Sequence, residues 1–238
     1  MTWIDWSMAG LIVLLGVFQL VLLSGVIHGE DALAAPPSID PSLLPEGNAP
    51  TGFAPWQLAQ QDDSPSLPGR YVRPRGIMHT DDWPLDRRIP YCEEGEVSNF
   101  CYASKPPTSG LHLPVQQSVE LDSGDVIRVP PAPGIYQFDL PREAVPHIQE
   151  HAGVFVGYDC ETDACRSAVS ELRSVVEQEL ARGAQVVMAR FSDLDADTIA
   201  LAAWTRVDSF RASDFDAERV RTFIRAHSCR YDPEGFCE

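Results

Sequence analysis

The sequence has few basic residues, and none of them precedes Arg70. Acidic residues outnumber lysine and arginine by 35 to 18 over 238 residues, which gives a formal net charge of -17. Because so acidic a chain repels phosphate backbones, we expect no nucleic-acid partner. A conventional signal peptide is also disfavoured, since its first region is positively charged.

Several motifs that mark common enzyme classes are also missing. The sequence has no P-loop, no Gly-x-Gly-x-x-Gly, no Cys-x-x-Cys-His and no Gly-x-Ser-x-Gly. These absences exclude nucleotide and c-type haem enzymes and make a serine hydrolase improbable. No Cys-x-x-Cys pair is present either, so a cysteine-based zinc site is the weaker interpretation of the six cysteines.

One long apolar run lies near the start of the chain. Met8 to Ile27 is 20 residues long, and a helix of that length spans the roughly 30 Å hydrocarbon core of a bilayer. We therefore predict a retained transmembrane anchor over residues 1–29. The alternative is a cleaved signal sequence, because Ala32-Leu33-Ala34 resembles a small-x-small cleavage site. The protein would then be secreted without residues 1–34.

The six cysteines fall into three local pairs: Cys92 with Cys101, Cys160 with Cys165, and Cys229 with Cys237. An even number of cysteines in short-range pairs is typical of disulfides formed in an oxidising compartment. Other connectivities stay open, but local pairing is the one we prefer. We therefore predict a single-pass membrane protein whose C-terminal domain is extracytoplasmic.

Residues 30–69 have the composition of a linker. They carry eight prolines and six acids but no base. Such a stretch cannot bury enough apolar surface to offset its chain entropy, so we predict an extended or disordered segment. It would hold a globular domain of residues 70–238 away from the membrane.

Hydrophobic periodicity in this domain alternates between strand and helix. The predicted strands span residues 125–129, 134–138, 153–158, 185–191 and 199–207. Helical spacing covers residues 163–182, which Gly183 ends, and a second helix runs from its cap at Asp216 to His227. The pattern predicts one small α/β or α+β domain with a mixed sheet and two main helices.

The segment from Pro146 to Gly153 carries two histidines on a helix of at most two turns. His147 and His151 are four residues apart, which lets two imidazoles on one helix face reach a single metal ion. Glu150 could add an oxygen ligand or act as a base, and His-x-x-Glu-His is also the inverted zinc-protease motif. The simpler interpretation is a hydrogen-bonded structural cluster.

A proline-rich loop from Lys105 to His112 supplies a third imidazole. Its two prolines stiffen the backbone and Gly110 permits a positive φ, so the loop presents His112 rigidly. His112, His147 and His151 together would suit zinc or copper. Alternatively, His112 only pins the loop to the domain. We identify no catalytic residue from these patterns.

Four segments occur in an order that resembles a known family. They are Pro106–His112, Gly134–Tyr136, Pro146–Tyr158 and Ala202–Trp204. Together they resemble the prokaryotic domain of unknown function 3105, over a stretch from Pro106 to Glu234. The resemblance implies a small, membrane-anchored envelope protein, and it implies no particular reaction.

The resemblance also singles out particular side chains. The family pattern implies a histidine after the Pro-Pro-Thr-Ser-Gly loop, which His112 matches, and a His-x-x-Glu-His-Gly-Gly segment. His147, Glu150 and His151 match that segment. Ala152 stands where the pattern has its first glycine. This difference affects the expected close approach of the backbone at that position, and it leaves the match of the two histidines unchanged.

These patterns predict a membrane-anchored extracytoplasmic protein that binds zinc or copper through His112, His147 and His151. Glu150 would be a further ligand or would orient one. The alternatives are a metal-free interaction or assembly module of an envelope complex, and a metal-assisted hydrolase that uses Glu150. The sequence leans against an enzyme. The expected partners are the membrane and other envelope proteins.

Overall fold

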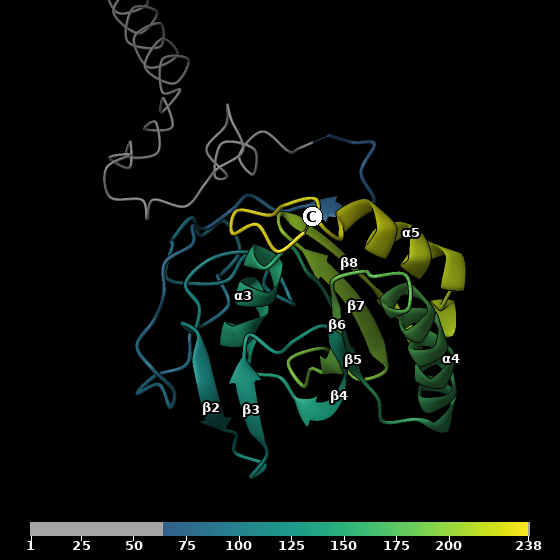
Figure 1. The fold of residues 1–238 in the computed structure, drawn as a ribbon, viewed down its shortest axis with the longest axis horizontal. Helices are drawn as coiled ribbons and strands as arrows, with labels where there is room; N and C mark the ends of the chain where they lie inside the picture. The colour runs from purple at the N-terminus through teal and green to yellow at the C-terminus, as the bar shows by residue number, and fades with distance from the viewer. Residues whose placement is uncertain (1–63, 238) are drawn as a thin grey trace, which may run out of the picture. The chain divides into compact units, whose positions relative to one another are not determined.

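A computed structural model describes residues 64–237, and Figure 1 shows how their helices and strands are arranged. The predicted anchor, the alternative cleavage site and residues 30–63 of the predicted linker lie outside the described residues. Within residues 64–237, every helix is too short or too polar to cross a bilayer.

The domain is built on a six-stranded mixed sheet with the strand order β1-β8-β7-β5-β6-β4. Its strands are β1 (Arg70–Tyr71), β4 (Gly134–Asp139), β5 (Val154–Asp159), β6 (Val186–Arg190), β7 (Thr198–Ala203) and β8 (Arg206–Arg211). Strand β6 is parallel to β4 and β5, whereas β7 is antiparallel to β5 and β8. The fold is therefore a mixed α+β domain.

Two long helices, α4 (Asp163–Leu180) and α5 (Ala217–His227), cover one face of the sheet (Figure 1). Asp216 caps α5 because its side chain accepts hydrogen bonds from the first backbone N–H groups of the helix. Leu172 and Phe223 are fully buried in the core between these helices and the sheet. Both helices that the periodicity predicts are therefore confirmed.

The opposite face is covered by less regular structure. The short helix α3 (Val145–Glu150) follows a 3-10 turn at Arg142–Ala144, and the antiparallel strands β2 (Gln116–Glu120) and β3 (Val126–Val129) pack beside it. Strands β5, β6 and β7 each contribute buried side chains to both cores, so they form the buried centre of the sheet. The predicted short helix before Gly153 is confirmed.

One predicted element is wrong. Residues 199–207 do not form a single strand, because the chain reverses at Trp204 and Thr205 between β7 and β8. Thr205 has φ of 62°, a conformation that glycine or asparagine usually supplies in such two-residue turns. The sequence therefore carries no ordinary turn signal at this position. Strand β2 was not predicted either.

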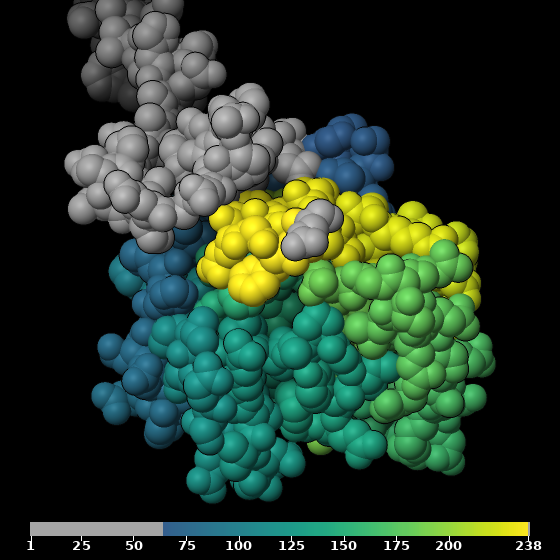
Figure 2. All heavy atoms as spheres, viewed as in Figure 1, coloured from purple at the N-terminus to yellow at the C-terminus, as the bar shows by residue number. Residues whose placement is uncertain are grey.

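The three local disulfides are confirmed, and the pairing leaves no free cysteine. The bond between Cys229 and Cys237 closes a loop after α5, which we call the tail loop (residues 229–237). In Figure 2 the yellow C-terminal segment lies across the teal part of the domain. The backbone N–H of Cys229 donates to the carbonyl of Ala152, so the tail loop is joined to the end of α3.

A buried arginine fixes the start of the described chain. Arg206 is 2% exposed, and its guanidinium donates hydrogen bonds to the carbonyls of Ser64, Leu67 and Gly69. The segment 64–69, which has the composition of the linker, therefore packs against β8.

Candidate metal centre

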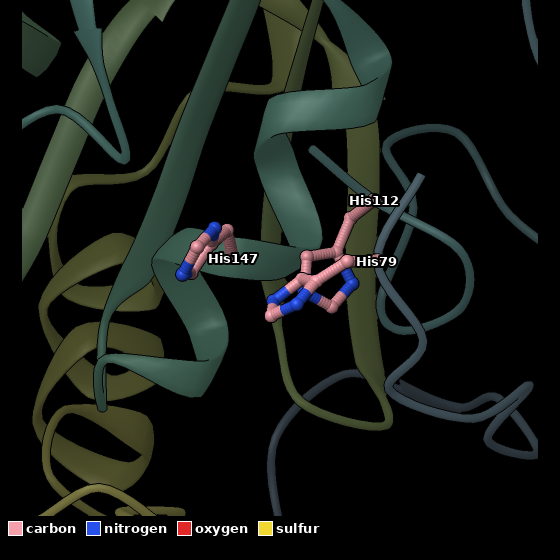
Figure 3. Close-up of side chains that lie close together, drawn as sticks. All are labelled: His79, His112 and His147. Atoms are coloured by element: carbon pink, nitrogen blue, oxygen red, sulfur yellow. The ribbon is translucent and has the colours of Figure 1, made fainter. Parts of the chain in front are cut away.

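Three histidines from separate parts of the chain lie together beside α3 (Figure 3). His147 lies on α3, His112 ends the proline-rich loop, and His79 comes from an irregular segment that pairs with His112 as a single β-bridge. One ring nitrogen of each histidine lies within 4.8 Å of one from each of the others. The three nitrogens are close enough that small rotations of the side chains would bring them around one ion.

His112 is completely buried and is held at one ring nitrogen. Its Nδ1 lies 2.7 Å from the carbonyl oxygen of Gly110, and because a carbonyl only accepts, Nδ1 is the donor. Its Nε2 lies 3.0 Å from a carboxylate oxygen of Glu150, without the angles of a hydrogen bond. The Nδ1 hydrogen bond therefore leaves Nε2, beside the carboxylate of Glu150, as the ring nitrogen that can bind an ion.

His147 is held in the same way. It is 1% exposed, and its Nδ1 donates to the carbonyl of Leu113 over 2.7 Å. Burial, together with the neighbouring His112, lowers the pKa of His147 to about 3. The imidazole is therefore neutral at pH 7, which is the protonation state that binds metals.

His79 was not predicted as a site residue. It is exposed, so it completes the group of three from the solvent side. Partial burial and the neighbouring His112 lower its pKa. His79 has no neighbouring histidine at a helical or strand spacing that would identify it in the sequence. Its ring contacts are with His112 and His147, which lie far along the chain.

His151 also lies next to His147, with 4.8 Å between the ring centroids. Its Nε2 is 3.0 Å from a carboxylate oxygen of Glu234 in the tail loop. His147, His151 and Glu234 form a second group with ligand atoms within 4.8 Å of one another. The predicted ligands are thus divided between two groups, and His147 belongs to both.

Glu150 interacts with a member of each group, His112 in the first and Glu234 in the second. It is 4% exposed, contacts His112, and ends α3. Burial and the charges of Glu150 and Glu234 raise the pKa of Tyr231, and burial with the Glu150 charge raises the pKa of Glu234. The two carboxylates are therefore close enough to repel each other, a repulsion that a bound cation would relieve.

The loop that carries His112 is fixed by hydrogen bonds on several sides. Gln149 donates its side-chain amide to the carbonyl of Pro107, and Ser109 accepts from the backbone N–H of Arg75. Gly110 has φ of 114°, so the expected positive φ is confirmed. These contacts hold His112 in place before any ion binds, as a preorganised site requires.

The backbone conformation at the end of α3 explains why the two residues after His151, Ala152 and Gly153, are small. Ala152 has φ of 62°, in the left-handed region that glycine adopts without strain. A Cβ on Gly153 would lie 2.6 Å from the carbonyl oxygen of Ile148, so only glycine fits there. Alanine at 152 keeps the backbone path of this turn at some conformational cost.

A cavity of about 150 Å³ opens beside the second group. Its walls include His151, Ile148 and Phe236, with Arg128 from β3. The ring of Phe236 stacks on that of His151, with 3.9 Å between the centroids. Solvent therefore reaches this side of the cluster past the tail loop.

The comparisons with known proteins agree with the motifs around these residues. Residues 95–237 match the family described as Protein of unknown function (DUF3105). None of the curated proteins or solved structures compared with the chain matches it significantly. The matched range contains every residue of the two groups except His79. Because the match covers more than half of the chain, the protein belongs to the DUF3105 family of proteins of unknown function.

Proposed function

We propose that the domain binds one transition-metal ion, zinc or copper, through His79, His112 and His147. The observation that carries this proposal is the way the two buried imidazoles are held. Each donates its Nδ1 proton to a backbone carbonyl, which leaves Nε2 as the nitrogen that can bind an ion. Metal-binding histidines are usually oriented by such a hydrogen bond from the nitrogen that does not bind the ion.

Glu150 is the fourth ligand in this proposal. Two atoms that each bind a zinc ion at about 2 Å lie roughly 3.3 Å apart in a tetrahedron. The 3.0 Å between Glu150 Oε2 and His112 Nε2 is close to that separation. Three neutral imidazoles and one carboxylate suit zinc or copper. Because Glu150 is then a ligand, this geometry favours binding over hydrolysis with Glu150 as a free base.

The same proposal places the domain outside the cytoplasm, anchored by the apolar run over Met8–Ile27. Three disulfides in one small domain support an oxidising compartment, since the cytosol keeps thiols reduced. Delivery, storage and sensing of a metal would all begin with the binding step proposed here. Other envelope proteins would be the partners that receive or supply the ion.

A second candidate function is a metal-free interaction module of an envelope complex. The disulfide-closed loop Cys92–Cys101 supports it, because Val97 and Phe100 on this loop are 70% and 69% exposed. Large apolar side chains exposed together often mark a protein contact. A purified protein that contains no metal would favour this candidate function over metal binding.

Metal content of the full chain tests the proposal. The protein would be made in an oxidising compartment without a polyhistidine tag, extracted in detergent, and measured by mass spectrometry. We expect about one zinc or copper ion per chain. The variant His147→Gln should lose it, and His227→Gln, which changes a buried histidine outside the cluster, should keep it. No metal in the wild-type chain after reconstitution would overturn the proposal.

A further inference from the structure

His147 is shared by two groups of metal-binding side chains within residues 64–237. One group, which we call the loop site, contains His79, His112 and His147. The other, which we call the tail site, contains His147, His151 and Glu234. The Nδ1 proton of His147 is donated to the carbonyl of Leu113, so only Nε2 has a lone pair for a metal. One lone pair cannot bind two ions at the same time.

We propose, resting on the metal-binding function above, that the loop site and the tail site are alternative positions for a single ion that pivots on His147. Movement from the loop site to the tail site breaks the bonds to His79, His112 and Glu150 and forms bonds to His151 and Glu234, with a water molecule from solvent filling the remaining position. Each exchange breaks one metal–ligand bond and forms another, with no change in the oxidation state of the ion.

Glu150 makes such an exchange electrostatically reasonable. Its carboxylate lies 3.0 Å from Nε2 of His112 in the loop site, and the carboxylate of Glu234 lies 3.0 Å from Nε2 of His151 in the tail site. A negative charge therefore stays close to the ion in both positions. An ion that moved away from all carboxylates would face a much larger barrier, because a buried cation needs a compensating charge.

The two positions open to solvent through different residues. The loop site opens at His79, which is exposed, while His112 and His147 behind it are buried. The tail site opens at Glu234, whose side chain is 44% exposed, beside the cavity next to His151. An ion that entered at one site would therefore have a separate exit at the other, which favours metal transfer over permanent storage.

Single and combined variants of the full chain test this inference with Zn²⁺ titrations. His79→Gln and Glu234→Gln each remove a solvent-exposed or half-exposed ligand of one site. We expect each to retain about one ion per chain, with the affinity lowered by roughly 10-fold. The combined variant and His147→Gln should lose at least about 100-fold, because both sites are then damaged. Thermal unfolding without metal would show that each variant is folded.

Copper loading gives a second readout that a purely structural role would not change. The electron paramagnetic resonance of bound Cu²⁺ reports the number of nitrogen ligands. We expect a three-nitrogen signal in Glu234→Gln, a two-nitrogen signal in His79→Gln, and a mixture in the wild-type chain.

Three results would overturn the inference in different ways. Two ions per wild-type chain would show that the sites are independent and filled together. Unchanged affinity and spectrum in Glu234→Gln would remove the tail site and leave the proposed function intact. No metal in the wild-type chain would remove the proposed function and this inference with it.

Discussion

His147 and His227 are both buried and both have a low pKa, yet their surroundings differ in one decisive respect. His227, at the end of α5, uses both ring nitrogens: Nε2 donates to the carbonyl of Pro68, and Nδ1 accepts from Arg230 Nε. His147 makes only its Nδ1 hydrogen bond to another described residue. Burial lowers the pKa of His227 to about 4 and that of His147 to about 3.

The comparison shows that burial and neutrality do not identify a metal-binding histidine. What separates the two is the second ring nitrogen, which is occupied in His227 and available in His147. On the helical side of the domain, His227 joins α5 to Pro68 and Arg230 through hydrogen bonds at both ring nitrogens. On the irregular side, His147 on α3 has one ring nitrogen that can still bind an ion. Variants of these regions can test that distinction.

The largest expected effect is on the thermal stability gained from metal. At a Zn²⁺ concentration 100 times the Kd, binding adds about 2.7 kcal/mol to the free energy of unfolding. The Tm of the wild-type chain and of His227→Gln should rise when Zn²⁺ is added. That of His147→Gln should stay within error of its metal-free value. An equal rise in all three, measured by calorimetry, would mean that the ion binds elsewhere.

The next effect is on the free energy of unfolding and on metal affinity when one of two disulfides is removed. These two disulfides close loops of similar length. Replacing either Cys229–Cys237 or Cys160–Cys165 with serines should lower the free energy of unfolding by about 2–3 kcal/mol. Only the first pair closes the tail loop that carries Glu234, so only its loss should also weaken Zn²⁺ binding. Urea unfolding and metal titration of both double variants would measure this. Equal metal affinity in the two would show that the tail loop does not take part.

The structural role of His227 predicts a pH dependence with a definite sign. Its pKa of about 4 lies below the ordinary value near 6.5, so the unfolded chain takes up the proton first as pH falls. Its contribution to stability is therefore complete above pH 6.5 and is lost as pH falls toward 4.

The variant His227→Gln should remove that dependence. We expect it to be about 1–2 kcal/mol less stable at pH 7, because it breaks buried hydrogen bonds. Its stability should also fall less steeply between pH 6.5 and pH 4, by up to about 1.4 kcal/mol per pH unit. Urea unfolding at several pH values measures both. Parallel curves for variant and wild type would contradict the structural role.

The smallest effect concerns the turn after α3, which links the two regions through its hydrogen bond to Cys229. Ala152→Gly should raise the free energy of unfolding by about 0.5–1 kcal/mol, because glycine adopts the positive φ without strain. Gly153→Ala is the matched control and should destabilise the domain, since its Cβ would meet the carbonyl of Ile148. A loss of stability in Ala152→Gly would contradict this account of the turn.

The fold was largely predictable where periodicity and caps coincide, as in α4 and α5. The hairpin between β7 and β8 was not, because Thr205 takes a conformation that its residue type rarely adopts. His147 and His151 stand out through their four-residue spacing. His79 and Glu234 could not be found in this way, since each reaches the cluster from an irregular segment distant in sequence from α3.

The division of His112 and His151 between two groups also has a physical cause. The four-residue spacing does bring His147 and His151 together, in the group that also contains Glu234. Helix α3 ends at Glu150, and His151 leaves the helical conformation with φ of -83° and ψ of 34°. Its imidazole therefore follows the turn toward the tail loop, and sequence spacing alone does not reveal this change of direction.

The contacts of Arg206 have a consequence for how a protease would dissect the protein. A cut just before Ser64 leaves the segment 64–69 in place, together with the carbonyls that accept from the guanidinium. A cut just before Arg70 removes three acceptors of a cation that is only 2% exposed. Limited digestion should therefore yield a resistant fragment whose first residues still include the prolines of this segment.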